Sequence, residues 1–211
     1  RGLGDVYKRQ HRAGVVVVGE DLGTVEPWVR EYLRERGIFG TSVFWFEKDE
    51  GGWPIHPQDF RSDAMVSVDT HDLPPAASYL AGEHVDLRES LGLLVKPVEE
   101  MRAEAREERD RVMARLREHG LIGEDPSERE VVEALHAYIV RTPAPILQVS
   151  LVNAVGERRA QNQPGTDQEY PNWRLPLADG TEQVVLVEEL ATNPRLQSLV
   201  ARLNQELEST R

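Results

Sequence analysis

The sequence predicts an α/β fold made of parallel βα units, of the kind that forms one half of a (β/α)8 barrel. Three observations predict it: short apolar runs bounded by polar residues, longer amphipathic stretches between some of them, and chemically capable side chains directly after the apolar runs. In a barrel, catalytic groups sit at the carboxyl ends of the strands. Residues that follow different runs are therefore expected to face a single site.

Four strands are expected along the chain. The first, residues 15–18 (VVVV), is a β-branched run of the kind found in strands buried on both faces. The others are residues 41–46 (TSVFWF), 64–68 (AMVSV) and 146–152 (ILQVSLV). A complete eight-stranded barrel needs four more strands, and no residues before residue 11 provide them.

Helices are expected after the first strand, between the third and fourth, and at the end of the chain. Thr24 is the expected N-cap of a helix over about residues 25–36, which Gly37 ends. Two long stretches, residues 95–119 and 127–141, separate the third and fourth strands. The former carries one apolar stripe with Glu and Arg elsewhere, the pattern of a solvated helix face. Residues 194–207 form the last predicted helix.

Composition excludes several classes of function. The 211 residues carry a net charge of −12, which disfavours a nucleic-acid partner, and no apolar run is long enough to span a membrane. The chain has no cysteine, which removes disulfides and thiolate metal sites and fits a reducing compartment, so we expect a cytoplasmic location. The histidines lack metal-ligand spacing, and we expect neither a metal nor an organic cofactor.

The first ten residues differ from the rest. Residues 1–10 (RGLGDVYKRQ) lack the apolar core of a signal peptide and fit poorly with the apolar run that comes after them. We expect them to be a non-native or disordered leader, with a native loop as the alternative. Residues 11–211 are expected to form the C-terminal part of a catalytic barrel domain.

Two carboxyl groups follow different predicted strands. Glu20 comes directly after the first strand and Gly19, and Asp72 follows the third strand. Glycosyl transfer with retention of configuration uses one carboxyl as proton donor and another as nucleophile, with further carboxylates stabilising the transition state. From spacing alone, however, a Glu-Asp pair at a strand end is also a helix-entry or ion-pair motif, and His71-Asp72 is also an ordinary hydrogen-bonded pair.

Four segments resemble one known family in order and spacing. They are residues 18–24 (VGEDLGT), 37–46 (GIFGTSVFWF), 69–74 (DTHDLP) and 162–174 (NQPGTDQEYPNWR). Together they are similar to glycoside hydrolase family 77, the 4-α-glucanotransferases of the amylomaltase or disproportionating type. The resemblance spans residues 14–211, although residues 99–140 are carried by helical pattern and not by motif.

The resemblance implies a retaining enzyme on an α-amylase-like (β/α)8 barrel, with this chain supplying strands five to eight. Glu20 matches the general acid/base, and Asp72 matches the transition-state stabiliser. The residues implied to bind the substrate are His71, Asn162, Asn172 and Arg174. The family nucleophile is an aspartate after the fourth strand, and it has no counterpart in this chain.

The implied substrate is an α-1,4-glucan or maltooligosaccharide, and the implied partner is the missing N-terminal half of the same barrel. We therefore expect the chain alone to be inactive. Two departures from the family pattern put details of substrate contact in doubt: Leu175 replaces a common arginine, and Val152-Asn153 replaces a common acidic pair. The alternatives are another α-amylase-clan hydrolase or debranching transferase, and a non-catalytic glucan-binding remnant.

Overall fold

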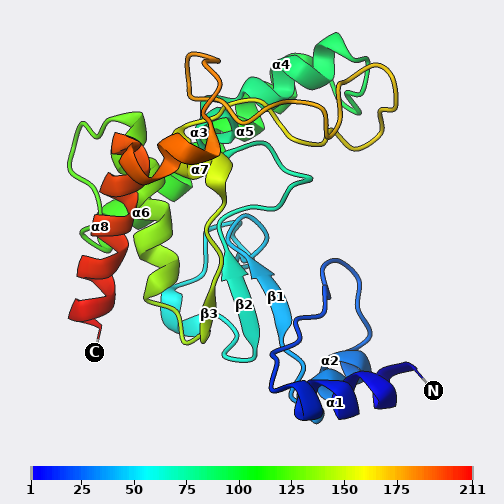
Figure 1. Cartoon of the computed structure of the whole chain (residues 1–211). Helices are drawn as coiled ribbons and strands as arrows, with labels where there is room; N and C mark the ends of the chain where they lie inside the picture. The colour runs from blue at the N-terminus through cyan, green and yellow to red at the C-terminus, as the bar shows by residue number, and fades with distance from the viewer. Residues whose placement is uncertain (1, 211) are drawn as a thin grey trace.

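The computed structural model describes residues 2–210, with side chains from residue 8 onward, and has an α/β fold around a parallel sheet. The sheet contains β1 (Gly40–Val43), β2 (Ala64–Ser67) and β3 (Ile146–Leu147), in that order. Gly40 lies opposite Ala64, and Met65 opposite Ile146. Figure 1 shows the three strands side by side.

The first predicted strand is reduced to one parallel bridge. Val18 pairs with Phe39 just before β1. The Gly19 N–H donates to the Phe39 carbonyl at 2.8 Å, and the Phe39 N–H donates to the Val17 carbonyl at 3.0 Å. This segment extends the sheet beyond β1 in the same direction. The four predicted runs thus lie across the sheet in chain order, all parallel.

Two predicted strands are longer than the observed ones. The second ends at Val43, where a turn closed by the Phe46 N–H and the Val43 carbonyl (2.8 Å) bends the chain. Phe44 and Trp45 are still fully buried, because they pack into the core from the turn. The fourth ends at Leu147, and its predicted last residues begin helix α7 instead. Apolar patterning alone cannot separate these cases from strand.

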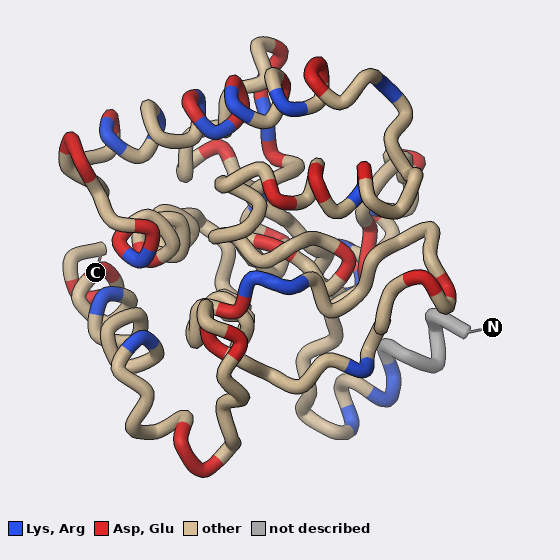
Figure 2. Tube along the Cα trace, turned by 90° about the horizontal axis from the view of Figure 1, so that it is seen from above, with Lys and Arg blue, Asp and Glu red and all other residues tan. Residues whose placement is uncertain are grey.

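The predicted helices are confirmed with shifted ends. They correspond to α2 (Pro27–Arg34), α5 (Val98–Glu118), α6 (Glu128–Val140) and α8 (Pro194–Ser209). The N-cap of α2 is Glu26 and not Thr24, with Pro27 at its first turn. At α6, Ser127 and Glu130 form a reciprocal capping box that fixes the start. Along α5, acidic and basic residues alternate, as the long helix at the top of Figure 2 shows.

The remaining helices were not predicted. They are α1 (Gly2–Ala13), α3 (Ala76–Ala81), α4 (Glu83–Ser90), α7 (Leu151–Val155) and the 3-10 helices η1 (Pro57–Asp59) and η2 (Val187–Thr192). Residues 2–10, expected to be a non-native or disordered leader, are helical as part of α1, and their origin stays a prediction. None of the described helices combines the length and apolar character needed to cross a bilayer.

The strand connections explain where the helices lie. The β1–β2 connection contains only η1, so the expected alternation of strand and helix fails there. The β2–β3 connection contains α3 to α6, and α6 packs on β2, α3, α5 and α8. In Figure 1, α1 and α2 lie at the opposite end of the molecule from α3, α4 and α5.

The main core lies between the sheet and helices α5 and α6. Its largest fully buried side chains include Phe44, Leu116, Leu135, Tyr138 and Ile139. A smaller cluster of Ala154, Leu199 and Leu203 joins α7 to α8. Side chains that follow β1 and β2, such as Phe44 and Ala76, belong to the main cluster, so the core reaches the carboxyl edge of the sheet.

Candidate active site

Asp72 lies in the loop between β2 and α3, at the carboxyl edge of the sheet. Its carboxylate accepts a hydrogen bond from Asn162 Nδ2 at 2.7 Å, and His71 Nε2 lies 3.5 Å from the same oxygen. The side chains of His71 and Asp72 are 56% and 52% exposed. The structure therefore brings three of the predicted site residues together at a solvent-facing point.

The loop that carries Asn162 also places an indole ring beside this group. The rings of His71 and Trp173 lie 5.0 Å apart, centre to centre. Trp173 has a φ of 61°, in the left-handed region that costs a non-glycine residue roughly 1–3 kcal/mol. The backbone hydrogen bond from Trp173 N–H to the Gln161 carbonyl (2.9 Å) fixes this conformation. Strained backbone of this kind clusters at functional sites.

Asn172 and Arg174 occupy different places in the same loop. The Asn172 side chain accepts from the Gln163 N–H at 2.7 Å and donates to Thr166 Oγ1 at 2.8 Å, so its amide holds the loop in shape. Arg174 is exposed, and its backbone N–H donates to the Pro171 carbonyl at 3.0 Å. The substrate-binding roles of both residues stay predictions.

Glu20 follows the Val18 bridge by two residues, and because Val18 pairs with Phe39, Glu20 lies beside the beginning of β1. Its side chain is exposed and makes no hydrogen bond or ion pair to the part of the chain that the structure describes. One strand, β1, separates this segment from β2, so the two backbones are about 10 Å apart at a strand spacing of ~4.8 Å. The structure brings Asp72, His71 and Asn162 together, and it shows no contact between Glu20 and this group among the described residues.

Asp21, next to Glu20, is buried and fully engaged. Its carboxylate accepts from Arg61 Nη1 at 2.7 Å and from the Thr41 N–H at 2.8 Å. Burial raises the pKa of Asp21, but these donors and the charge of Arg61 outweigh it and hold that pKa below its usual range. A Cβ on Gly40 would lie 2.7 Å from the Asp21 carboxylate and 2.5 Å from Arg61 Nη2, so only glycine fits there. Asp21 is therefore an anchor for the strand end.

Asp69 and Asn153 form a buried pair that sequence reasoning missed. Asn153 Nδ2 donates to Asp69 Oδ2 at 2.8 Å, and Asn153 Oδ1 accepts from the Ala76 N–H at 2.9 Å. Burial raises the pKa of Asp69 to about 7, against the smaller opposing effect of these uncharged donors. Asn153, one of the departures from the family pattern, thus forms an internal link to the loop that carries Asp72.

A cavity of about 240 Å³ opens beside Asp72, between its loop and helices α4 and α5. Its polar walls include Tyr79, which donates to Glu108 at 2.9 Å and stacks on His84 with ring centres 4.5 Å apart. The cavity is also lined by Leu73, Pro74, Arg88, Met101, Glu104, Ala105 and Gln163. The wall thus combines hydrogen-bond donors and acceptors with apolar side chains.

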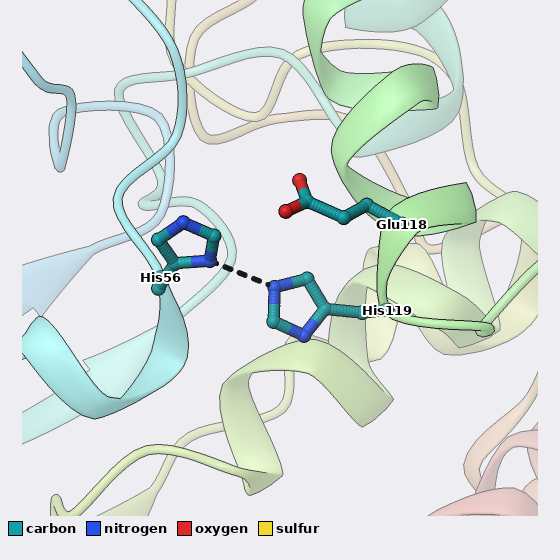
Figure 3. Close-up of side chains that lie close together, drawn as sticks. All are labelled: His56, Glu118 and His119. Atoms are coloured by element: carbon teal, nitrogen blue, oxygen red, sulfur yellow. Dashed lines mark hydrogen bonds between the residues drawn. The ribbon is translucent and has the colours of Figure 1, made fainter.

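A second group of titratable side chains lies away from this edge (Figure 3). His56, Glu118 and His119 each offer a metal-ligating atom, and these atoms lie within 4.8 Å of one another. Histidine spacing in the sequence could not reveal this group, because His56 and His119 are 63 positions apart.

Hydrogen bonds already account for this group. Arg115 Nη1 donates to His56 Nε2 at 2.9 Å and to Glu118 at 2.8 Å, and His56 Nδ1 lies 3.1 Å from His119 Nε2. A cation at the same point would face the charge of Arg115 and compete with it for two ligands. We interpret the group as a link between the loop before η1 and the end of α5.

A parallel α/β sheet followed by a loop with a carboxylate, an imidazole and an amide is an arrangement found in β/α enzymes. The profile of glycoside hydrolase family 77, described as 4-alpha-glucanotransferase, matches residues 3–181. The chain belongs to this family.

Named relatives agree with this assignment. The 4-alpha-glucanotransferase of Mycobacterium tuberculosis is 53% identical over 203 residues, which cover 93% of this chain and 28% of the relative. The enzyme of that name from Haemophilus influenzae is 27% identical over 186 residues, 84% of this chain and 26% of its own. The chain therefore spans about a quarter of the length of these relatives.

Solved structures of amylomaltases resemble the chain. The amylomaltase from Corynebacterium glutamicum has a TM-score of 0.89 at 38% identity, covering 97% of this chain and 30% of that one. The amylomaltase from Streptococcus agalactiae in complex with acarbose has a TM-score of 0.56 at 16% identity, covering 95% and 34%, and shows the fold alone.

Proposed function

We propose that this chain is the C-terminal portion of a retaining 4-α-glucanotransferase, contributes strands five to eight of its (β/α)8 barrel, and supplies two of the three catalytic carboxyl groups. Glu20 is the general acid/base and Asp72 the transition-state stabiliser. The observation that carries this proposal is the Asp72 carboxylate, held by Asn162 and His71 in the exposed loop after β2.

The chemistry is a double displacement. The protonated Glu20 carboxyl donates its proton to the glycosidic oxygen while a nucleophilic carboxylate, from a part of the enzyme outside this chain, attacks the anomeric carbon. The bond to the leaving glucan breaks as the glycosyl-enzyme bond forms. Glu20, now ionised, then takes the proton from the 4-hydroxyl of an incoming glucan, whose oxygen displaces the carboxylate. The second step regenerates both groups.

Asp72 acts by charge and by hydrogen bonding. The anomeric carbon becomes cationic in the transition state, so a fixed carboxylate nearby is favoured more there than in the ground state. The exposed Asp72 carboxylate keeps one oxygen that accepts no hydrogen bond from the described residues, and it can accept from sugar hydroxyls. We infer that His71, which lies beside Trp173, contacts the same sugar.

The substrate class follows from the surface and from relatives. A wall of donors and acceptors next to Asp72 suits a polyol, and the overall charge of −12 suits a neutral one. The amylomaltase from Streptococcus agalactiae was solved in complex with acarbose. We infer that α-1,4-glucans and maltooligosaccharides are donor and acceptor.

The test uses the complete enzyme that contains this chain and measures maltotriose disproportionation. Glu20→Gln is expected to lower kcat by about 10²–10⁴-fold, because proton transfer is lost while shape is kept. The exposed control Glu26→Gln, six residues away, should leave kcat unchanged. Wild-type turnover in Glu20→Gln would remove Glu20 from its role, and glucose release without transfer would favour a hydrolase.

A further inference from the structure

We propose that Asn153 is a positioning residue for glucan transfer: it ties together the two ends of the loop that bears His71 and Asp72, and thereby sets the place of the Asp72 carboxylate. The proposal rests on the function proposed above for Asp72. It concerns a side chain that touches neither substrate nor reacting atoms, because it lies beneath the loop.

The loop begins and ends on Asn153. Asp69 follows β2, Ala76 opens α3, and the six residues between them include His71 and Asp72. Asn153 donates to the Asp69 carboxylate and accepts from the Ala76 N–H, at 2.8 and 2.9 Å. Both hydrogen bonds are buried, with Asn153 4% and Asp69 5% exposed. Water cannot replace either partner without opening the site.

Two further hydrogen bonds of the loop are local. The Leu73 N–H donates to the Thr70 carbonyl at 3.1 Å, and the Asp72 N–H donates to Thr70 Oγ1 at 3.3 Å. These bonds shape the turn but do not fix it relative to the sheet. The long-range side-chain hydrogen bonds of residues 69–76 come from Asn153 and Asn162, which both belong to the chain after β3. The segment after β3 therefore positions the end of β2.

Asparagine meets both demands with one side chain. Position 153 must donate to a carboxylate and accept from a backbone N–H, and a primary amide does both in a fixed plane. An alanine does neither. An aspartate accepts from Ala76 but donates to Asp69 only while the two carboxyl groups share a proton, because like charges this close cannot both ionise.

The experiment compares three variants in the complete enzyme by kcat, KM and pH profile for maltotriose disproportionation. Asn153→Ala is expected to lower kcat by roughly 10–100-fold with little change in KM, the loss that a displacement of about 1 Å produces. Asn153→Asp should keep most of its kcat at the acid end and lose it as pH rises. The exchanged pair, Asp69→Asn with Asn153→Asp, should recover both kcat and the wild-type profile, since it reverses donor and acceptor.

The outcomes separate this proposal from simpler ones. Ile139→Val, a change in the buried core, lowers stability and should leave kcat unchanged. If Asn153→Ala fails to fold, the exchanged pair still tests whether the hydrogen bond between positions 69 and 153 sets kcat. A folded exchanged pair with kcat as low as that of Asn153→Asp, or wild-type kcat and profile in Asn153→Ala, would overturn the link. Absence of transfer by the wild-type enzyme would instead overturn the proposed function.

Discussion

Two buried aspartates flank the two predicted catalytic residues, and they are held in opposite ways. Asp21, beside Glu20, lies against the Arg61 guanidinium and a backbone N–H. Asp69, three residues before Asp72, lies against an asparagine amide. A cation keeps the first carboxylate ionised, and its pKa is lowered. Neutral donors do not offset burial for the second, and its pKa rises to about 7.

The contributions of Asp21 and Asp69 to folding stability therefore change with pH in opposite directions. A lowered pKa means that Asp21 contributes stability above its unfolded value of 3.8, and that this is lost as pH falls through the lowered folded pKa. A raised pKa means that folded Asp69 binds its proton more tightly than the unfolded chain does. Its contribution is complete below 3.8 and is lost as pH rises through about 7.

The largest expected effect comes from Asp69→Asn. A rise of about three pKa units corresponds to a loss of about 4 kcal/mol in unfolding free energy between pH 4 and pH 8. The asparagine keeps an acceptor for Asn153 and has no proton to lose, so this part of the pH dependence should vanish. Urea unfolding of the chain at several pH values measures it. The exposed control Asp125→Asn should leave the pH dependence of the unfolding free energy as it is. An unchanged pH dependence in Asp69→Asn would show that Asp69 is not its source.

Near Asp21, the largest loss of unfolding free energy is expected when Arg61 is removed. Arg61→Ala leaves the Asp21 carboxylate buried without its closest charge, a change that costs about 3 kcal/mol. Arg30 is the matched control, because it lies 3.6 Å from Asp21 and its side chain is 47% exposed. Arg30→Ala should cost no more than about 0.5 kcal/mol. Equal losses in both variants, measured by the same unfolding, would show that Asp21 is not anchored mainly by Arg61.

Local and periodic signals predicted much of the fold. The helix predicted to begin near residue 127 does begin there, at the Ser127–Glu130 capping box, and the order of the four apolar runs matches their order across the sheet. The predicted strand lengths were wrong, because turn residues such as Phe44 are as buried as strand residues. Family motifs placed Asp72 and Asn162, which the structure joins, and their roles with that of Glu20 stay predictions.

Side-chain pairs that are distant in the sequence could not be predicted from it. Asp69 and Asn153 are 84 positions apart, and His56 and His119 are 63 apart. Each pair depends on how strands and helices pack, which no local spacing encodes. The identity of a residue shows that it can donate or accept, whereas only the fold shows to whom.

The smallest expected effect concerns the exposed hydrogen bond from Asn162 to the loop of Asp72, in contrast to the buried hydrogen bonds from Asn153. Asn162→Ala removes the donor at 2.7 Å from Asp72, but this carboxylate is 52% exposed and water can take the donor's place. A hydrogen bond in that setting is worth about 0.5–1.5 kcal/mol, so kcat for disproportionation should fall by roughly 2–10-fold in the complete enzyme. Gln168→Ala, exposed in the same loop, is the control and should be neutral. A loss beyond about 100-fold would mean that Asn162 contacts the sugar itself, and no loss would mean that the Asn153 link positions Asp72 alone.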